Sequence, residues 1–260
     1  SLKLNLLSSL TFNLLTYLTV FLASLFHPYD NDLGWHLKYG EYFFENHTIL
    51  RENIFSSQMP NYHWVNSSWL TDLISYTTFV NFGFLGLSIL GASIITATFY
   101  FFAKSVKLDF FEKALIFPIL LYFLAPLNSV SFRGQLLSLM LLGILSYILF
   151  ERRPAERVGV ENYNEDIRTS RFNLSRAMRE ARRITSIYLL PPLFLFWSNL
   201  HGQFILGLAV FAIWIVTTSA TTYKENPLHV LRLLIIFLLS LAFTLINPFG
   251  LGVYNEALKH

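Results

Sequence analysis

The sequence has no cysteine and little charge. With no Cys among its 260 residues, a disulfide framework, a thiolate nucleophile and a cysteine zinc site are excluded. Charged residues make up 13% of the chain, whereas an ordinary soluble domain has roughly 25%. Hydrophobic residues reach 54%, and Phe alone contributes 26 residues. A soluble core of this size cannot bury so much apolar surface, so the composition predicts a polytopic membrane protein.

Apolar runs long enough for helices recur along the chain. Residues 4–26 carry no charge, and about 20 apolar residues span the hydrocarbon core as a helix. Lys3 would hold the N-terminus in the cytoplasm; a cleaved signal peptide is the alternative, although its apolar region is usually only about 7–15 residues. Further spans are expected at residues 84–103, 114–127, 135–150, 184–198, 203–222 and 233–246. The predicted fold is all-α, a single transmembrane domain over residues 1–260 with about seven spans.

Basic residues are concentrated in three of the polar segments between these runs. Counted from a cytoplasmic N-terminus, residues 104–113, 151–183 and 223–232 lie inside and carry three, nine and two of the nineteen Lys and Arg residues. This distribution agrees with the excess of positive charge on the cytoplasmic side of membrane proteins. A nucleic-acid partner is not expected for the Arg-rich loop 151–183. Only Tyr163 and Phe172 could stack on bases there, and six acids dilute the positive field.

A long polar segment, residues 27–68, follows the first apolar run and is expected on the outer face. Residues 34–46 predict a short amphipathic helix at the interface. Residues 66–80 predict a second, with Asp72 near its N-terminus, where the helix dipole favours an anion, and a break at residues 81–83. The acidic and basic side chains of the 27–68 segment include Asp30, Asp32, His36, Glu41, His47, Arg51, Glu52 and His63. This density predicts a functional site, and a solvated loop with interfacial aromatic residues is the alternative.

Polar elements far apart in the sequence reach the same face in this topology. They are the 27–68 loop and the turns around Arg133, at 197–202 and at 247–250. The side chains expected to reach one outer site are Asp30, Asp32, His36, Arg133, Asn199, His201 and Asn247. These residues lie on the same side of the membrane only if the number of spans between them is right. The predicted site therefore depends on the predicted topology.

The first polar loop also carries a motif of a known family. Its pattern Asp30-Asn-Asp32-Leu-Gly-Trp35-His36-Leu-Lys-Tyr-Gly40 resembles the first outer loop of bacterial GT-C type membrane glycosyltransferases, which transfer sugars from polyprenyl-phosphate carriers. Similar segments follow in the same order: Asn53-Ile-Phe55-Ser56, His63-Trp64-Val-Asn-Ser-Ser-Trp69-Leu70, Arg133-Gly-Gln135, Trp197-Ser-Asn199-Leu-His201-Gly202 and Asn247-Pro248-Phe-Gly250. The resemblance covers residues 27–252. Since family members are commonly longer, it implies an N-terminal catalytic part or a homologue truncated at its C-terminus.

The resemblance implies a reaction and roles for these residues. A sugar on a lipid phosphate presents its anomeric carbon at the extracytoplasmic surface of the cell membrane, and an acceptor on a glycan, lipid or protein attacks it with inversion. An aspartate of the first outer loop accepts or orients the acceptor proton, which maps onto Asp32 first and Asp30 second. The departing phosphate needs a cation or hydrogen-bond donors. The residues implied for donor phosphate and substrate binding are Arg133, His36, His201, Asn199 and Trp35.

Each candidate also has a structural interpretation. Asp30 and Asp32 are well placed to cap the helix that starts near Leu33. His36 is one turn beyond Asp32 and is a possible hydrogen-bond partner for it on the same helix face. The corresponding alternatives further along the chain are as follows. Arg133 would anchor a helix end at the lipid headgroups, His201 would be part of an ordinary polar turn, and Asn247 would end a helix.

A divalent cation, Mg²⁺ or Mn²⁺, is left open by the sequence. Asp30, Asp32, His36 and Glu41 supply suitable oxygen and nitrogen ligands, and some GT-C enzymes need such an ion while others do not.

Two other function classes also remain. A transporter or flippase-like protein would use broken spans and ionisable residues, but the charges here gather at span ends. A non-catalytic assembly subunit would tolerate changes at Asp30 and Asp32.

Overall fold

The computed structural model describes residues 2–55, 57–58, 62–128, 132–150, 186–224 and 226–258, with side chains from residue 11 onward. Over these ranges the protein is helical, and the only β-type contact is an isolated antiparallel bridge between Glu52 and His63. The all-α prediction is therefore confirmed. The predicted Arg-rich loop at residues 151–183 lies outside the described residues.

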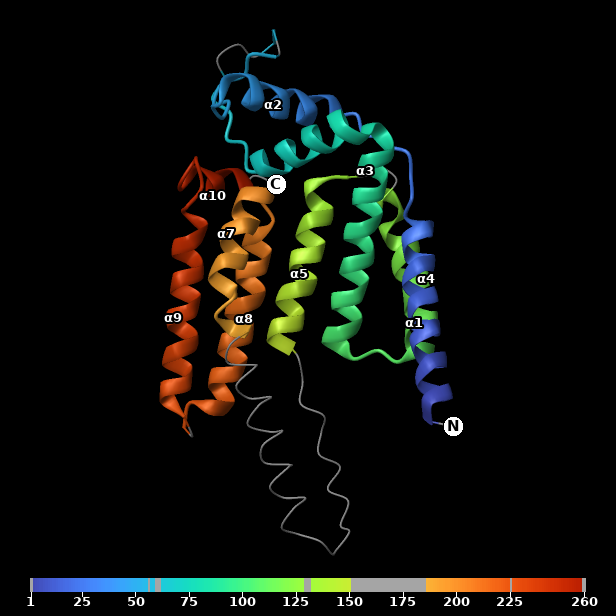
Figure 1. The fold of residues 1–260 in the computed structure, drawn as a ribbon. Coiled ribbons are helices and arrows are strands. Elements are labelled where there is room, and N and C mark those ends of the chain that lie inside the picture. The colour runs from blue at the N-terminus through green and yellow to red at the C-terminus, as the bar shows by residue number, and fades with distance from the viewer. Residues whose placement is uncertain are drawn as a thin grey trace, which may run out of the picture.

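Most helices run side by side as a bundle with roughly parallel axes (Figure 1). These are α1 (Leu2–Ala23), α4 (Phe110–Asn128), α5 (Gly134–Phe150), α7 (Leu190–Leu200), α8 (Phe204–Thr222), α9 (Pro227–Thr244) and the second half of α3 (Trp69–Val106). Many of their outward side chains are large and apolar, such as Phe111 and Leu238 at 80% and 62% exposure. A bundle with an apolar outer surface is what a lipid environment requires.

Four of these helices are long and apolar enough to cross a membrane: α3, residues 110–127 of α4, α8 and α9. The chain is thus supported as a membrane protein, but the predicted seven spans are not confirmed. Helix α5 has 17 residues and α7 only 11, or about 25 Å and 17 Å at 1.5 Å per residue. A typical hydrocarbon core is about 30 Å thick. Two prolines begin α7, and extended backbone at His201 ends it, which explains its short length.

A glycine divides α3 into two arms. Gly83 has φ +61° and ψ −155°, which interrupts the helical geometry, and this combination is essentially restricted to glycine. The break falls in the predicted 81–83 segment. It separates an arm at residues 69–82, which turns across the end of the bundle, from an arm at 84–106, which runs down through it (Figure 1).

Helices α7 and α8 pack through large buried side chains. Phe194 and Trp197 of α7 stack at 5.8 Å, and Phe194 stacks on Phe211 of α8 at 6.3 Å. Gly207 of α8 lies against the Trp197 indole, where an added Cβ would come within 2.4 Å of the ring. This packing fixes the end of α7 that carries Asn199 and His201.

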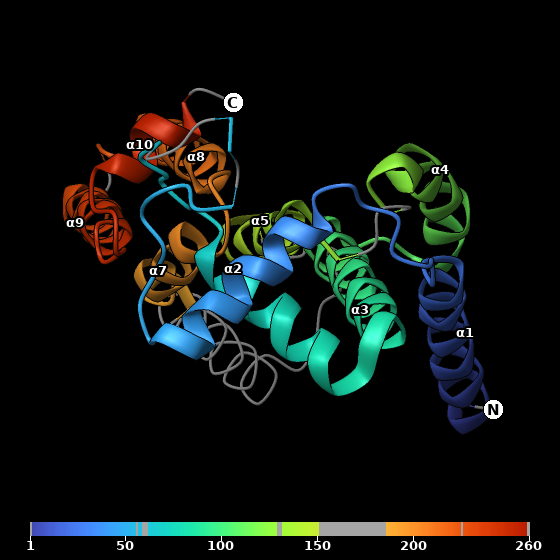
Figure 2. The same cartoon turned by 90° about the horizontal axis from the view of Figure 1, so that it is seen from above.

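One end of the bundle collects the polar elements. Helix α2 (Leu33–Asn46), the first arm of α3 and the short α10 (Gly252–Ala257) all lie at that end (Figure 1). Viewed from there, α2 runs across the bundle rather than along it (Figure 2). The ends of α5 and α7 that carry Arg133 and His201 meet the same layer. The four polar elements expected to converge therefore share one end of the bundle.

Candidate functional site

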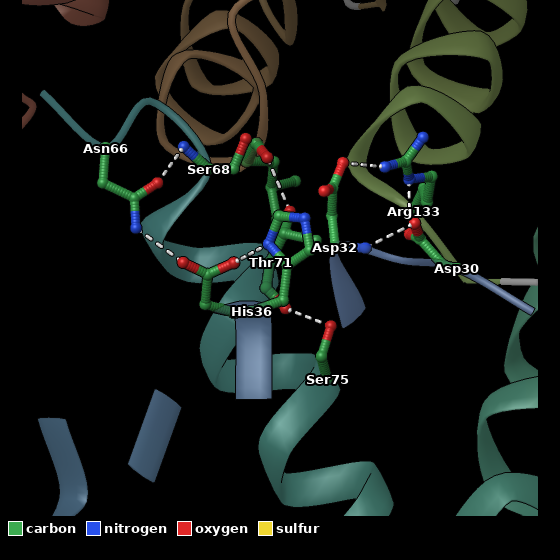
Figure 3. A network of polar contacts seen from close by, with 10 residues as sticks. Asp30, Asp32, His36, Asn66, Ser68, Thr71, Ser75 and Arg133 are labelled. Carbon is green, nitrogen blue, oxygen red and sulfur yellow. Dashed lines mark hydrogen bonds and ion pairs between the residues drawn. The ribbon is translucent and has the colours of Figure 1, made fainter. Parts of the chain in front are cut away.

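Arg133 joins the two aspartates of the first polar loop. Its Nε lies 2.5 Å from Oδ2 of Asp30, and one terminal nitrogen lies 2.6 Å from Oδ2 of Asp32 (Figure 3). The Nε contact is an ion pair whose N–H is not aligned as a hydrogen bond, whereas the contact with Asp32 is also a hydrogen bond. Arg133 is about a hundred positions from the two aspartates in sequence, so folding creates this cluster.

The two carboxylates have opposite exposure. The Asp30 side chain is 4% exposed, while that of Asp32 is 62% exposed, and Arg133 between them is 21% exposed. The buried carboxylate of Asp30 balances the positive charge of Arg133 on the side that faces the protein interior. The exposed carboxylate is the one that an incoming molecule can meet.

A tight turn places Asp30 and Asp32 together ahead of α2. The Asp32 backbone N–H donates to Oδ1 of Asp30 at 2.9 Å. Asp32 occupies the N-cap position of α2 but makes no side-chain cap hydrogen bond. Helix capping by the Asp32 side chain is therefore wrong, because that carboxylate turns to Arg133 instead.

His36 does not bond to Asp32, its neighbour one turn earlier. Its Nδ1 lies 2.6 Å from Oδ1 of Asp72, on the first arm of α3. Oδ2 of Asp72 accepts a hydrogen bond from Nδ2 of Asn66 at 2.5 Å, and Oδ1 of Asn66 accepts from the Ser68 backbone N–H at 3.0 Å. Asp72 is 1% exposed and Asn66 8%. The alternative of a His36–Asp32 pair is thus wrong, and Asp72 is the partner.

Two opposing effects act on the pKa of His36. Burial of the imidazole lowers the pKa, but the hydrogen bond to Asp72 and the charges of Asp72 and Asp30 raise it, and Arg133 lowers it slightly. The net result is a pKa raised above the ordinary 6.5. The charges of Asp30 and Arg133 therefore act on the imidazole in opposite directions.

Asn199 holds helices together. Its Nδ2 donates to the carbonyl oxygens of Leu195 and Ile246 at 2.8 and 2.9 Å, and its Oδ1 accepts from the Trp69 indole at 2.8 Å. Both amide hydrogens are therefore used within the protein. The role implied for Asn199 as a donor to the lipid phosphate does not fit this geometry, so we assign it to positioning α3, α7 and α9.

His201 lies beside the turn that carries Arg133. Its Nδ1 is 3.0 Å from Oγ of Ser138, which itself accepts from the Trp197 indole at 3.0 Å. An added Cβ at Gly134 would come within 2.6 Å of the His201 ring. His201 thus packs directly behind the residue next to Arg133, where it supports the arginine turn.

The remaining candidates are less closely engaged. Trp35 is 41% exposed and its ring faces Phe55 at 6.2 Å, so it lies outside the polar network. Glu41 pairs with Lys38 at 2.5 Å on the surface of α2. Asn247 donates from Nδ2 to the Ser198 carbonyl oxygen and accepts from the Phe249 N–H, in agreement with its interpretation as a helix end.

The metal candidates do not assemble. Asp30 and Asp32 face an arginine, and His36 faces Asp72. Within the described ranges no group of three or more His, Asp or Glu side chains is arranged to hold a metal ion. A guanidinium between the carboxylates supplies the positive charge that a cation would bring, so the residues do not fit a divalent ion and no step is derived through one.

Sequence reasoning missed the roles of Asp72, Asn66 and Ser138. From the sequence, Asp72 is predicted only to be an anion near a helix start. One signal was available, because it is the only acidic residue in the 38 residues of α3, and an ionisable residue in an otherwise apolar helix is a functional candidate by default. Asn66 and Ser138 carry no comparable signal.

The chain matches no protein-family model, no curated protein and no solved structure at a significant level.

Proposed function

We propose that this chain is a membrane glycosyltransferase that transfers a sugar from a polyprenyl-phosphate donor to an acceptor at the polar end of the bundle. The observation that carries the proposal is the Asp30–Arg133–Asp32 cluster, with one buried and one exposed carboxylate on a single guanidinium. Glycosyl transfer from a lipid phosphate needs a carboxylate for the acceptor and a cation for the leaving phosphate within one site. The resemblance in the first polar loop supports the same reaction. It also implies that the polar end of the bundle lies on the extracytoplasmic face.

Arg133 is suited to the leaving phosphate. A planar guanidinium binds two phosphate oxygens at once, and such charge-assisted pairs are stronger than neutral hydrogen bonds. Its pair with Asp32 is mostly exposed, and exposed ion pairs contribute only about 0–1 kcal/mol. A phosphate can therefore replace Asp32 on Arg133 at small cost, while the buried Asp30 keeps the arginine in place.

Asp32 is suited to the acceptor. When a phosphate takes its place on Arg133, the 62% exposed carboxylate is released next to the anomeric carbon and can orient an acceptor hydroxyl. The acceptor oxygen attacks that carbon, and the bond from carbon to phosphate oxygen breaks on the opposite face, so the configuration inverts. The electron pair leaves with the lipid phosphate, whose charge Arg133 balances.

The test is sugar transfer from a labelled polyprenyl-phosphate sugar pool in membranes, comparing wild type with Asp32→Asn at matched expression. Loss of the carboxylate that orients the acceptor hydroxyl is expected to slow transfer about 100-fold or more. Asp109→Asn is the matched control, since Asp109 lies in the turn at the other end of the bundle and asparagine can keep its hydrogen bond to the Glu112 N–H. Normal transfer by Asp32→Asn overturns the mechanism, and no transfer by wild type from any donor favours a transporter.

A further inference from the structure

We infer that His36 is the catalytic residue that takes up the acceptor proton, with Asp72 as the positioning residue behind it. The inference rests on the proposed function and deepens it, because the resemblance implied only a phosphate contact for His36. Four observations carry it: the direction of the hydrogen bonds, the burial of Asp72, the rigidity of its support and the charges around the imidazole.

The hydrogen bonds define which nitrogen of His36 can accept a proton. One carboxylate oxygen of Asp72 accepts a hydrogen bond from Asn66 Nδ2, and the other oxygen lies 2.6 Å from His36 Nδ1. Burial raises the pKa of Asp72, and the contacts with His36 and Asn66 lower it. With Asp72 ionised beside the imidazole, its carboxylate can only accept hydrogen bonds. Nδ1 of His36 therefore carries the hydrogen, and in the neutral imidazole the lone pair is on Nε2.

The support of the imidazole is rigid. Asp72 is 1% exposed, and its backbone N–H donates to the Ser68 carbonyl oxygen at 3.0 Å. The preceding residue, Thr71, donates a hydrogen bond from Oγ1 to the Leu200 carbonyl oxygen at 2.5 Å. This bond connects the first arm of α3 to α7. Gly40 allows close contact between α2 and α3, since an added Cβ would come within 2.6 Å of the Asp72 carbonyl oxygen. The ring is held from behind on two helices, as a proton acceptor of fixed direction requires.

The imidazole faces the arginine cluster while remaining accessible. Its side chain is 30% exposed, and Asp72 lies against its Nδ1 at 2.6 Å. Figure 3 shows the Asp32–Arg133 pair on the other side of the ring. The charged groups that act on the imidazole are Asp72, Asp30 and Arg133. Asp32 pairs with the same arginine, and Tyr39 of α2 is acted on by Asp72. An acceptor held on Asp32 would release its proton on the side of the site where the imidazole of His36 lies.

The proton balance of transfer is then complete. The acceptor oxygen forms a bond to the anomeric carbon, the bond from that carbon to the phosphate oxygen breaks, and the lipid phosphate keeps the electron pair. The acceptor proton moves to Nε2 of His36, and the resulting imidazolium is stabilised by the Asp72 carboxylate. The exposed part of the ring then returns the proton to water, which restores the neutral imidazole for the next turnover.

The experiment measures kcat, donor KM and the pH profile of kcat/KM for wild type, His36→Gln, Asp72→Asn and the control His229→Gln at the other end of the bundle. In wild type we expect kcat/KM to rise with pH through the pKa of His36, which the bond to Asp72 holds above 6.5. His36→Gln should lose this limb and about 100-fold in kcat, with donor KM within about twofold. Asp72→Asn should move the limb to lower pH, because burial remains while the raising effect of Asp72 is removed.

The outcomes separate this inference from the proposed function. If wild type transfers sugar and His36→Gln keeps both the acidic limb and its kcat, His36 is not the proton acceptor, although the transferase proposal stands. If wild type transfers from no donor, both fail. If His36→Gln does not fold, wild type is treated with diethyl pyrocarbonate and the modified histidines are located by mass spectrometry. Loss of transfer in proportion to modified His36 supports the inference, and full transfer with His36 modified overturns it.

Discussion

Removal of the Arg133 charge tests the asymmetry of the cluster directly. In Arg133→Gln the carboxylate of Asp30, 4% exposed, loses the cation that compensates its burial. The carboxylate of Asp32, 62% exposed, is solvated with or without the arginine. One substitution therefore affects two ion pairs of similar length to very different extents.

The magnitudes follow from exposure. Breaking a fully buried ion pair costs about 3–5 kcal/mol. Arg133 is 21% exposed and its Nε is not aligned as a hydrogen bond to Asp30, so we expect a coupling of about 2–3 kcal/mol for this pair. An exposed pair is worth about 0.2–1 kcal/mol, and that is the expected coupling of Arg133 with Asp32.

Two double-mutant cycles measure these couplings, one with Asp30→Asn and one with Asp32→Asn, each combined with Arg133→Gln. The free energy of unfolding is taken from reversible unfolding in mixed detergent micelles. The cycle isolates the pairwise interaction from the other effects of each substitution. Equal couplings, or a larger one for Asp32, would refute the reasoning that burial sets the strength of the two pairs.

Three further predictions concern the elements that hold the site. Gly83→Ala should cost about 1–3 kcal/mol in unfolding, since φ is +61° there although the space is open; a neutral effect would show that the kink relaxes. Gly40→Ala should cost about 1–3 kcal/mol by overpacking against Asp72 and Tyr76, and unchanged thermal stability would contradict this contact. The folded-state pKa of His36 is raised above 6.5, so its stabilisation is full below pH 6.5 and declines as pH rises through that pKa. Thermal unfolding of His36→Gln should lack this decline, which a retained decline would disprove.

Local chemistry made most helices predictable. The uncharged run at 203–222 predicted α8 to within one residue, whereas α9 begins six residues before the predicted start at 233. Asn-Phe-Gly predicted the break that the structure has at Gly83. The number of spans was less predictable, because an apolar run does not say how much of it is helix. Pro191 and Pro192 lie at the start of α7, and only nine residues of the predicted 184–198 span, 190–198, belong to this 11-residue helix.

The site was predictable as a gathering of residues and not as a set of bonds. Crossing counts predicted that Asp30, Asp32 and Arg133 share one end of the bundle, and they are in contact. The partner of His36 was not predictable, because spacing along α2 favours Asp32, while the choice of Asp72 depends on how the first arm of α3 packs beneath α2. Asn199 was misjudged for the same reason, since its hydrogen bonds go to helices distant in sequence.

The central claim is that the polar end of this bundle breaks the bond between a sugar and its lipid phosphate. Its most direct test reconstitutes the purified protein in vesicles with a polyprenyl-phosphate donor labelled in the sugar, and follows the label with and without Arg133→Gln. The account predicts that the label leaves the lipid and appears on an acceptor in wild type, and that it stays on the lipid in the variant. Label that crosses the bilayer on intact lipid, without transfer, would contradict the claim and identify a transporter.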